Sequence, residues 1–174
     1  MQEQYNTLAK ILHWAIAILI VINVGVSLYM DDLPRAEKLP VIHFHISIGI
    51  LILELVVIRI FWSFYKPGPA LPETVPGKER KLAKILQHSL YLLMLLVPIV
   101  GYLNVITIGS DASFFGIYSL PSVLSKSKEL HEIFEDTHAY LAWTIVAFAS
   151  LHMLAGIRHI LKKDGLFKRM WFSK

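Results

Sequence analysis

Four long apolar runs alternate with short polar stretches along the chain, and each run is long enough to form a membrane-spanning helix. The runs cover about residues 8–29, 41–64, 85–108 and 138–161. About 20 helical residues cross the hydrocarbon core of a bilayer, and each run reaches this length with few internal charges. The pattern predicts an all-α fold, a transmembrane four-helix bundle that forms one integral membrane domain over residues 1–174.

Composition narrows the chemistry that such a bundle can perform. Charged residues make up 17% of the chain, whereas ordinary soluble chains carry roughly 25%. The spans leave only short connections, so any reaction has to take place between the helices. The absence of cysteine excludes disulfides, iron–sulfur clusters, thiolate zinc sites and haem attached through cysteine. Eight histidines are therefore the strongest candidates for metal ligands.

Lysine and arginine are distributed unevenly between the two ends of the predicted spans. The net charge of +4 could suggest a nucleic-acid partner, but the basic residues gather at the helix ends on one side, which is typical of the cytoplasmic face of a membrane. We therefore expect no nucleic-acid partner. The opposite side, with loops expected at about residues 30–40 and 107–137, holds only Arg35, Lys38, Lys126 and Lys128. The positive-inside rule predicts that both termini lie in the cytoplasm.

Four histidines lie within or at the ends of the apolar runs: His13, His45, His138 and His152. An ionisable residue inside lipid is a functional candidate, although each of these alone could simply bond to a neighbouring helix. His138 and His152 are fourteen residues apart, so they share one helix face at two depths about 21 Å apart. Two haem groups stacked in a bundle need this arrangement, in which one helix gives an axial imidazole to each iron.

The direction of each span predicts the partner of each histidine. His13 and His152 both lie toward the inner side, so they can ligate the iron of an inner haem. His45 and His138 both lie toward the outer side and can ligate the iron of an outer haem. Ligation by two imidazoles favours low-spin electron transfer and leaves no open position for dioxygen.

Further polar residues near these histidines have open roles. His43 competes with His45, but residues two apart on a helix point in nearly opposite directions. His131, seven residues before His138 in a charged stretch, is a weaker competitor. Arg59 lies fourteen residues after His45, where its guanidinium could bind a haem propionate or extend to the membrane interface. Glu54 faces away from His45 and would need a partner from a neighbouring helix, water or another subunit.

His88 and His159 lie at the inner edge of the third and fourth runs, among basic residues. Either could donate a hydrogen bond to a quinone carbonyl or relay its proton. Each could equally be an interfacial histidine that bonds to water or lipid headgroups.

Taken together, these residues resemble the bacterial cytochrome b561 family of small, four-span di-haem membrane cytochromes, which includes superoxide oxidases. The matching motifs are His13-Trp14, His45-Ile46-Ser47-Ile48-Gly49 with Arg59, His88-Ser89-Leu90-Tyr91, Phe115-Gly116, His138 with His152, and the tail from Lys163 to Met170. The resemblance implies haem b as cofactor, two per chain, with axial ligation by the four histidines already paired. It also implies electron exchange with ubiquinone, and it suggests superoxide or a redox protein as the outer donor.

We therefore expect an electron-transfer protein of the bacterial inner membrane, in contact with the lipid bilayer, that passes electrons between an outer-side donor and ubiquinone. It would be an oxidoreductase of the superoxide:ubiquinone type. The alternative is a haem-binding membrane-anchor subunit that accepts electrons from a partner dehydrogenase or hydrogenase. A transporter without haem is a third possibility, and it predicts no Soret absorbance.

Overall fold

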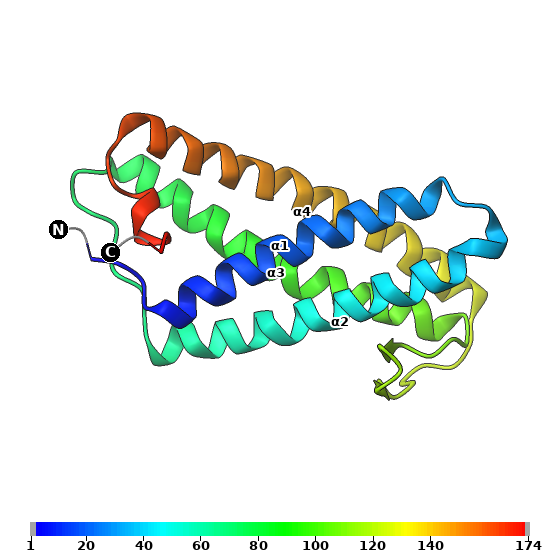
Figure 1. Ribbon diagram of the computed structural model, residues 1–174. Helices are drawn as coiled ribbons and strands as arrows, with labels where there is room; N and C mark the ends of the chain where they lie inside the picture. Colours follow the sequence, from blue (N-terminus) through cyan, green and yellow to red (C-terminus); the bar gives the residue numbers. More distant parts are fainter. Residues whose placement is uncertain (1–2, 173–174) are drawn as a thin grey trace.

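The computed structural model of the protein describes residues 3–172 and contains, within them, four long helices, one short hairpin and a 3₁₀ turn (Figure 1). The elements are α1 (Thr7–Asp31), α2 (Arg35–Tyr65), α3 (Gly77–Thr107), β1 (Ser113–Phe114), β2 (Tyr118–Ser119), α4 (Lys128–Lys162) and η1 (Phe167–Arg169). Strands β1 and β2 pair antiparallel, with Ser113 opposite Ser119. All four helices are long and apolar enough to cross a membrane, which confirms the predicted all-α membrane bundle.

Three helices begin well before the apolar runs that predicted them. α2 starts six residues before the run at 41, α3 eight before the run at 85, and α4 ten before the run at 138. The first turn of each carries an acidic residue, Glu37, Glu79 or Glu129, which favours a helix N-terminus. The Ser127 side chain also accepts the Leu130 N–H and caps α4. Acidic first turns, with a side-chain cap in α4 only, thus accompany helical segments that extend beyond the apolar parts, and residues 35–40 and 128–137 are helical where loops were expected.

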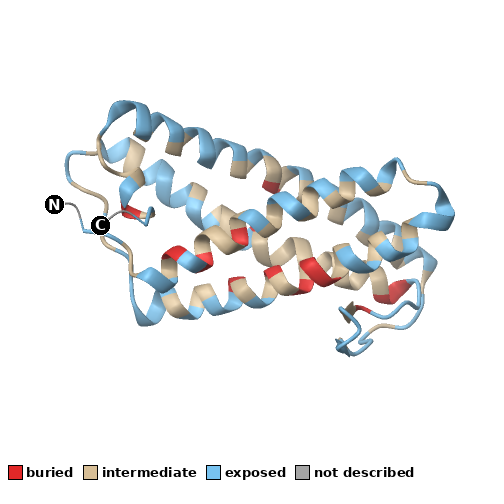
Figure 2. Ribbon diagram, viewed as in Figure 1, coloured by how far each residue is buried: buried red, intermediate tan, exposed pale blue. Residues whose placement is uncertain are grey.

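The helices pack in sequence order around a small apolar centre. α1 packs on α2, α2 on α3, and α3 on α4; within residues 3–172, no Cα of α4 lies within 8 Å of one in α1 or α2. Figure 2 shows buried residues on the mutually facing sides of the helices and exposed residues over most of the rest. The centre consists of Ile16 from α1 with Ile48, Ile52 and Val56 from α2. α4 therefore faces α1 and α2 at longer range.

The outer surface of the bundle is apolar. Val21, Phe61 and Leu161 are 72%, 70% and 76% exposed. Surfaces of this kind are covered by lipid in a membrane-spanning bundle.

The loop after α3 folds back along α2 and defines what we call the hairpin end of the bundle. The Ser47 hydroxyl accepts the N–H of Phe115 at 2.9 Å. The hydroxyl of Tyr118 donates a hydrogen bond to the Glu54 carboxylate. Glu54, which had no assigned partner in the sequence, is therefore bound by the hairpin.

Both chain ends lie at the opposite end, which we call the terminal end (Figure 1). Arg169 is 4% exposed and binds three backbone carbonyls, those of Glu3, Pro69 and Ala70, at 3.1, 2.6 and 2.9 Å. The N–H of Tyr5 donates to the Arg169 carbonyl at 3.1 Å. One buried arginine thus joins the N-terminal segment, the α2–α3 loop and the C-terminal tail.

Candidate functional site

Two pairs of histidines face each other across the bundle, one near each end. At the terminal end, α1 supplies His13 and α4 supplies His152, and their ring centroids are 6.0 Å apart. At the hairpin end, α2 supplies His45 and α4 supplies His138, with centroids 6.2 Å apart. The structure therefore brings together the two pairs that the sequence spacing proposed. The pairs lie at two depths because His138 and His152 are separated by about 21 Å along α4.

The separation within each pair matches one axially coordinated metal. Two metal–imidazole bonds of about 2 Å each, plus the distance from each nitrogen to its ring centre, separate two axial rings by about 6 Å. Among the described residues, no group of three or more His, Cys, Asp or Glu side chains could hold a metal ion. A metal at either pair therefore needs its other ligands from a cofactor, such as a planar macrocycle.

The ring of His138 is held in the orientation that a metal ligand requires. Its Nδ1 lies 3.0 Å from the carbonyl of Val97 on α3. Since a carbonyl only accepts, Nδ1 carries the proton and Nε2 keeps its lone pair, which is the usual state of a metal-binding histidine. Gly101 makes room for the ring, because a Cβ there would lie 2.8 Å from Cε1 of His138.

The hairpin end contains buried polar atoms that have no partner among residues 3–172. They include the side-chain oxygens of Asn23 and Asn104, whereas the His45 ring lies beside the backbone of Asn23. Buried polar groups are normally hydrogen-bonded. Gly49, one turn after His45, has only the Asn23 amide near the position of a Cβ, at 3.9 Å. These features fit a bound group with polar atoms.

Arg59 reaches the terminal-end pair from α2. Its Nη1 donates to the Ala9 carbonyl at 3.2 Å, one turn before His13. Its Nε donates to the Tyr91 hydroxyl on α3 at 3.0 Å. Its positive charge acts on both His13 and His152. Arg59 is therefore a cation beside this histidine pair and is held by two other helices.

The C-terminal tail covers α1 next to His13. The indole N–H of Trp14 donates to the Met170 carbonyl at 3.0 Å. The Trp14 ring also packs against Phe167 and Trp171, with centroids 6.4 and 5.4 Å away. This aromatic contact limits the access of water to the terminal-end pair from the membrane surface.

The competing histidines lie apart from both pairs. His43 is exposed, and its place next to His138 is taken by His45. His131 lies 3.7 Å from the Glu135 carboxylate on its own helix.

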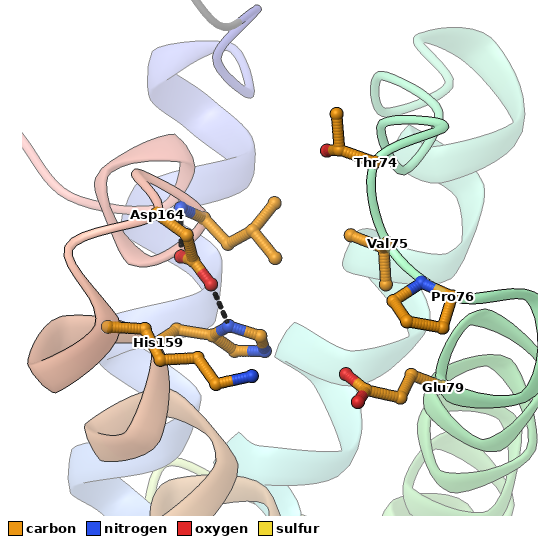
Figure 3. Close-up of a pocket in the computed structure, with 8 residues that line it drawn as sticks. Thr74, Val75, Pro76, Glu79, His159 and Asp164 are labelled. Carbon is orange, nitrogen blue, oxygen red and sulfur yellow. Dashed lines mark hydrogen bonds and ion pairs between the residues drawn. The ribbon is translucent and has the colours of Figure 1, made fainter.

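The two proposed quinone contacts, His88 and His159, and the proposed propionate contact, Arg59, are separated from one another in the structure. His88 is exposed, with Nδ1 2.6 Å from the Lys84 carbonyl of its own helix. His159 lines a cavity of about 360 Å³ that also includes Glu79 (Figure 3). Nine residues of α3 separate Glu79 from His88, a distance of about 14 Å. Arg59 lines a different cavity, of about 310 Å³.

Within the His159 cavity, the imidazole is paired with an acid from the tail. His159 Nδ1 donates to the Asp164 carboxylate at 2.6 Å (Figure 3). Partial burial raises the pKa of Asp164, but the hydrogen bonds from His159 and the Leu166 N–H, with the nearby charges, lower it overall. The sequence analysis missed this pair. The sequence feature that could have indicated it is Lys163-Asp164-Gly165, directly after the fourth apolar run. In the structure Lys163 and Gly165 take φ values of 53° and 81°, and this tight turn brings Asp164 back to the helix.

A membrane bundle with two facing imidazole pairs at different depths is typical of membrane proteins that hold metal macrocycles between their helices. The chain belongs to the prokaryotic cytochrome b561 family, whose model matches residues 4–173. It is 31% identical over 173 residues to cytochrome b561 homolog 2 of Escherichia coli K12, covering 97% of this chain and 91% of that protein.

Two further relatives are similar over different lengths. The probable superoxide oxidase CybB of Yersinia pestis is 27% identical over 172 residues, covering 98% of this chain and 97% of that protein. Cytochrome b562 of Cereibacter sphaeroides is 37% identical over 106 residues, covering 56% of this chain and 63% of that protein. Proteins of the b561 family bind haem b, typically two per chain. The chain is therefore a multi-pass bacterial membrane protein that transfers electrons through haem b.

Proposed function

We propose that this chain is a di-haem b oxidoreductase that passes electrons across the inner membrane from an outer-side donor to ubiquinone. The observation that carries this proposal is that two pairs of imidazole rings face each other, one pair at each end of the bundle. The ring centroids within the two pairs are 6.0 and 6.2 Å apart. His13 and His152 would hold the inner haem iron, and His45 and His138 the outer one. Bound haem b supplies one-electron transfer.

The residues around each pair orient and insulate the sites. Val97 and Gly101 set the orientation of His138. Arg59 offers a cation for a haem propionate, and Trp14 with the tail excludes water near His13. The apolar centre around Ile16 and Val56 separates the two ends with a layer of low polarity.

Superoxide is the proposed outer donor because a relative of almost equal length is a probable superoxide oxidase. Two superoxide ions release two electrons and become two molecules of dioxygen. One ubiquinone takes up those two electrons with two protons and becomes ubiquinol. Ubiquinone is the acceptor in this proposal because the inner end offers hydrogen-bonding groups for a quinone carbonyl.

The cavity beside His159 is the proposed place of the quinone headgroup. Its volume of about 360 Å³ is within the usual size range of ligand sites, about 300–1,000 Å³. His159 is fixed by Asp164 through Nδ1, so Nε2 is the nitrogen left for a quinone oxygen. His88, the other quinone candidate, lies exposed elsewhere on α3 and does not line this cavity.

Paired and crossed histidine variants test the ligand assignment. If each pair holds one haem, His13→Ala, His152→Ala and their double variant each lose the same single haem. The crossed double variant His13→Ala/His138→Ala loses both. Pyridine haemochrome measurements give haem per chain, and His43→Ala serves as the control that keeps both groups. Loss of only one haem in the crossed variant would contradict the pairing.

The reaction is tested on the purified protein. Reduction of its haem by superoxide, with ubiquinone as the final acceptor, supports the proposed oxidoreductase. Reduction only in the presence of a co-purifying dehydrogenase or hydrogenase would instead identify an anchor subunit. His159→Gln should lower the rate of quinone reduction while both haems stay bound. An unchanged rate would show that the quinone does not bind in this cavity.

A further inference from the structure

Lys10 is a buried cation one turn before His13. Its residue is 6% exposed, although it lies near the start of a membrane-spanning helix where a lysine usually extends to water. Its Nζ donates to the side-chain oxygen of Gln4 at 2.6 Å. The neighbouring carbonyl, that of Ala9, accepts from Arg59. Two cations, Lys10 from α1 and Arg59 from α2, are thus both bound to the segment of chain that precedes His13.

Neither of these cations is neutralised by the protein. Within residues 3–172, no carboxylate oxygen lies within 4.0 Å of Lys10 or Arg59, because Glu79 pairs with Arg158 and Asp164 with His159. A buried charge is costly unless a counter-charge and hydrogen bonds compensate it. The neutral amide of Gln4 satisfies one donor of Lys10 and leaves its charge in place.

The donors of the two side chains are only partly used. An ammonium group has three donors and a guanidinium has five. Among residues 3–172, Lys10 uses one, to Gln4, and Arg59 uses two, to Tyr91 and Ala9. Arg169, the other buried cation at this end, differs because it binds three backbone carbonyls and joins three chain segments. Lys10 and Arg59 therefore keep both charge and donors for an anion from outside the chain.

We propose that Lys10 and Arg59 together form the site that binds the two carboxylates of the haem at the terminal end. The proposal rests on the proposed function, which assigns this haem to His13 and His152. One monovalent cation for each carboxylate neutralises the ligand, and charge-assisted hydrogen bonds of this kind are the strongest that side chains make. Lys10 is the new member of this site. From its position near the start of a helix alone, its side chain would be expected to be exposed at the membrane interface.

The expected consequence is electrostatic and confined to one haem. Reduction adds an electron, so a nearby positive charge favours the reduced state and raises the reduction potential, which depends on net charge around the iron. Removal of the Lys10 charge should therefore lower the potential of the terminal-end haem and weaken its retention. The haem at the hairpin end lies about 21 Å away along α4 and should change little.

The experiment compares four variants by spectroscopic redox titration and by haem content after detergent gel filtration. Lys10→Met keeps the length and removes the charge, and Lys10→Arg keeps the charge. Lys81→Met removes an exposed charge at the same end and is the matched control. Gln4→Ala removes the hydrogen-bond partner while leaving the Lys10 charge. Each is also made in the His45→Ala background, in which only the terminal-end haem is expected to remain, so that its signal is assigned.

We expect a lowered terminal-end potential and loss of part of this haem in Lys10→Met alone. A purely structural role of Lys10 predicts that Gln4→Ala has the same effect, and that result would overturn the proposal. So would an unchanged potential in Lys10→Met, or a shift confined to the hairpin-end haem. If Lys10→Met does not accumulate, a lowered potential in Lys10→Arg would equally overturn it. If the wild-type protein binds two haems and Lys10→Met leaves the potential and content of the terminal-end haem unchanged, the Lys10–Arg59 site is refuted but the proposed function is not. If the wild-type protein binds no haem, the proposed function itself is refuted.

Discussion

Single side-chain contacts decide which nitrogen each histidine presents and where its ring lies. The Val97 carbonyl fixes the proton of His138 on Nδ1, and Gly101 allows the ring to approach α3. The sequence identified the histidines because helical periodicity relates positions fourteen residues apart. It did not identify Gly101, whose role depends on a contact between α3 and α4.

Substitution of Gly101 should disturb the hairpin-end site. In Gly101→Ala, the new Cβ would lie 2.8 Å from Cε1 and 3.0 Å from Nδ1 of His138, so the ring or the helix has to move. Overpacking of this kind typically costs about 1–3 kcal/mol. We expect loss of one haem per chain, or loss of its low-spin spectrum, measured by haemochrome quantification and absorption spectroscopy.

A second glycine supplies the control for this substitution. A Cβ at Gly156 on α4 would meet Phe167 at 4.0 Å, an ordinary contact. Gly156→Ala should therefore keep both haems. If Gly101→Ala also keeps both with unchanged spectra, the close approach of α3 to His138 does not govern ligation.

Lys10 marks the limit of prediction at the residue scale. Its position in the sequence, near the start of an apolar run, predicts an exposed lysine at the interface. The structure buries it to 6% exposure because the N-terminal segment folds over it and supplies Gln4 as a partner. Such burial depends on contacts that periodicity does not describe.

At the scale of elements, apolar runs predict that the helices exist but do not predict where they begin. Polar first turns and caps extend α2, α3 and α4 by six to ten residues. The position of the hairpin could not be predicted from the sequence either, because its contacts with α2 join residues that are 64 to 68 positions apart. Glu54 could not be explained before the hairpin was seen to lie along α2.

The bond between Tyr118 and Glu54 should be visible in a pH titration. The hydrogen bond to Glu54, with burial and the carboxylate charge, raises the pKa of Tyr118 above its ordinary value. A raised pKa means that the stabilising contribution is present below about pH 10, the usual tyrosine value, and is lost as pH rises through the raised pKa. Tyrosinate absorbance, taken as the difference between wild type and Tyr118→Phe, should therefore appear at higher pH than for exposed tyrosines.

Glu54→Ala should remove most of this shift. The variant lacks both the oxygen that accepts the hydrogen bond of the phenol and the negative charge that opposes its ionisation. Hydrogen exchange of residues 112–120 should be faster in this variant than in wild type, because the hairpin has lost its contact at that point of α2. Ser119→Ala, on the exposed strand, is the control. An unchanged titration of Tyr118 in Glu54→Ala would show that the two groups do not interact.

The turn between α4 and the tail should respond to acid. The pKa of Asp164 is raised by partial burial, but it is lowered overall by the hydrogen bonds from His159 and Leu166. The contribution of this group is therefore present above about pH 4, the usual range of an aspartate, and is lost as pH falls through the lowered pKa. Hydrogen exchange in residues 163–172 should accelerate in that acidic window.

Asp164→Asn provides the comparison. The amide cannot ionise, so exchange in residues 163–172 should start faster at neutral pH and show no acid transition of its own. Haem content should stay at the wild-type level, because neither histidine pair has a contact with Asp164 among the described residues. A wild-type acid transition in Asp164→Asn would assign the pH response to another group.

For the whole molecule, the spacing of the helices is what creates two sites in so short a chain. α4 supplies one histidine to each pair yet keeps its backbone more than 8 Å from α1 and α2 throughout the described residues. Packed helices normally have axes 8–10 Å apart, and the three consecutive pairs of helices pack together while α4 remains distant from the first two. The apolar centre of α1 and α2 lies between the two ends. The bundle is therefore organised around its two histidine pairs rather than around one filled core.

The orientation of this bundle in the membrane decides which pair meets the outer donor. Among residues 3–172, twelve of the sixteen lysines and arginines lie at the terminal end or its flanks, and the positive-inside rule predicts that this end lies in the cytoplasm. Because the chain has no cysteine, single cysteines can be introduced without a background. A membrane-impermeant maleimide should label Ser125→Cys, in the exposed loop after the hairpin, in intact cells. Glu73→Cys, in the exposed loop between α2 and α3, should react only after lysis; the reverse pattern would place His13 and His152 on the outer side and reverse the proposed direction of electron transfer.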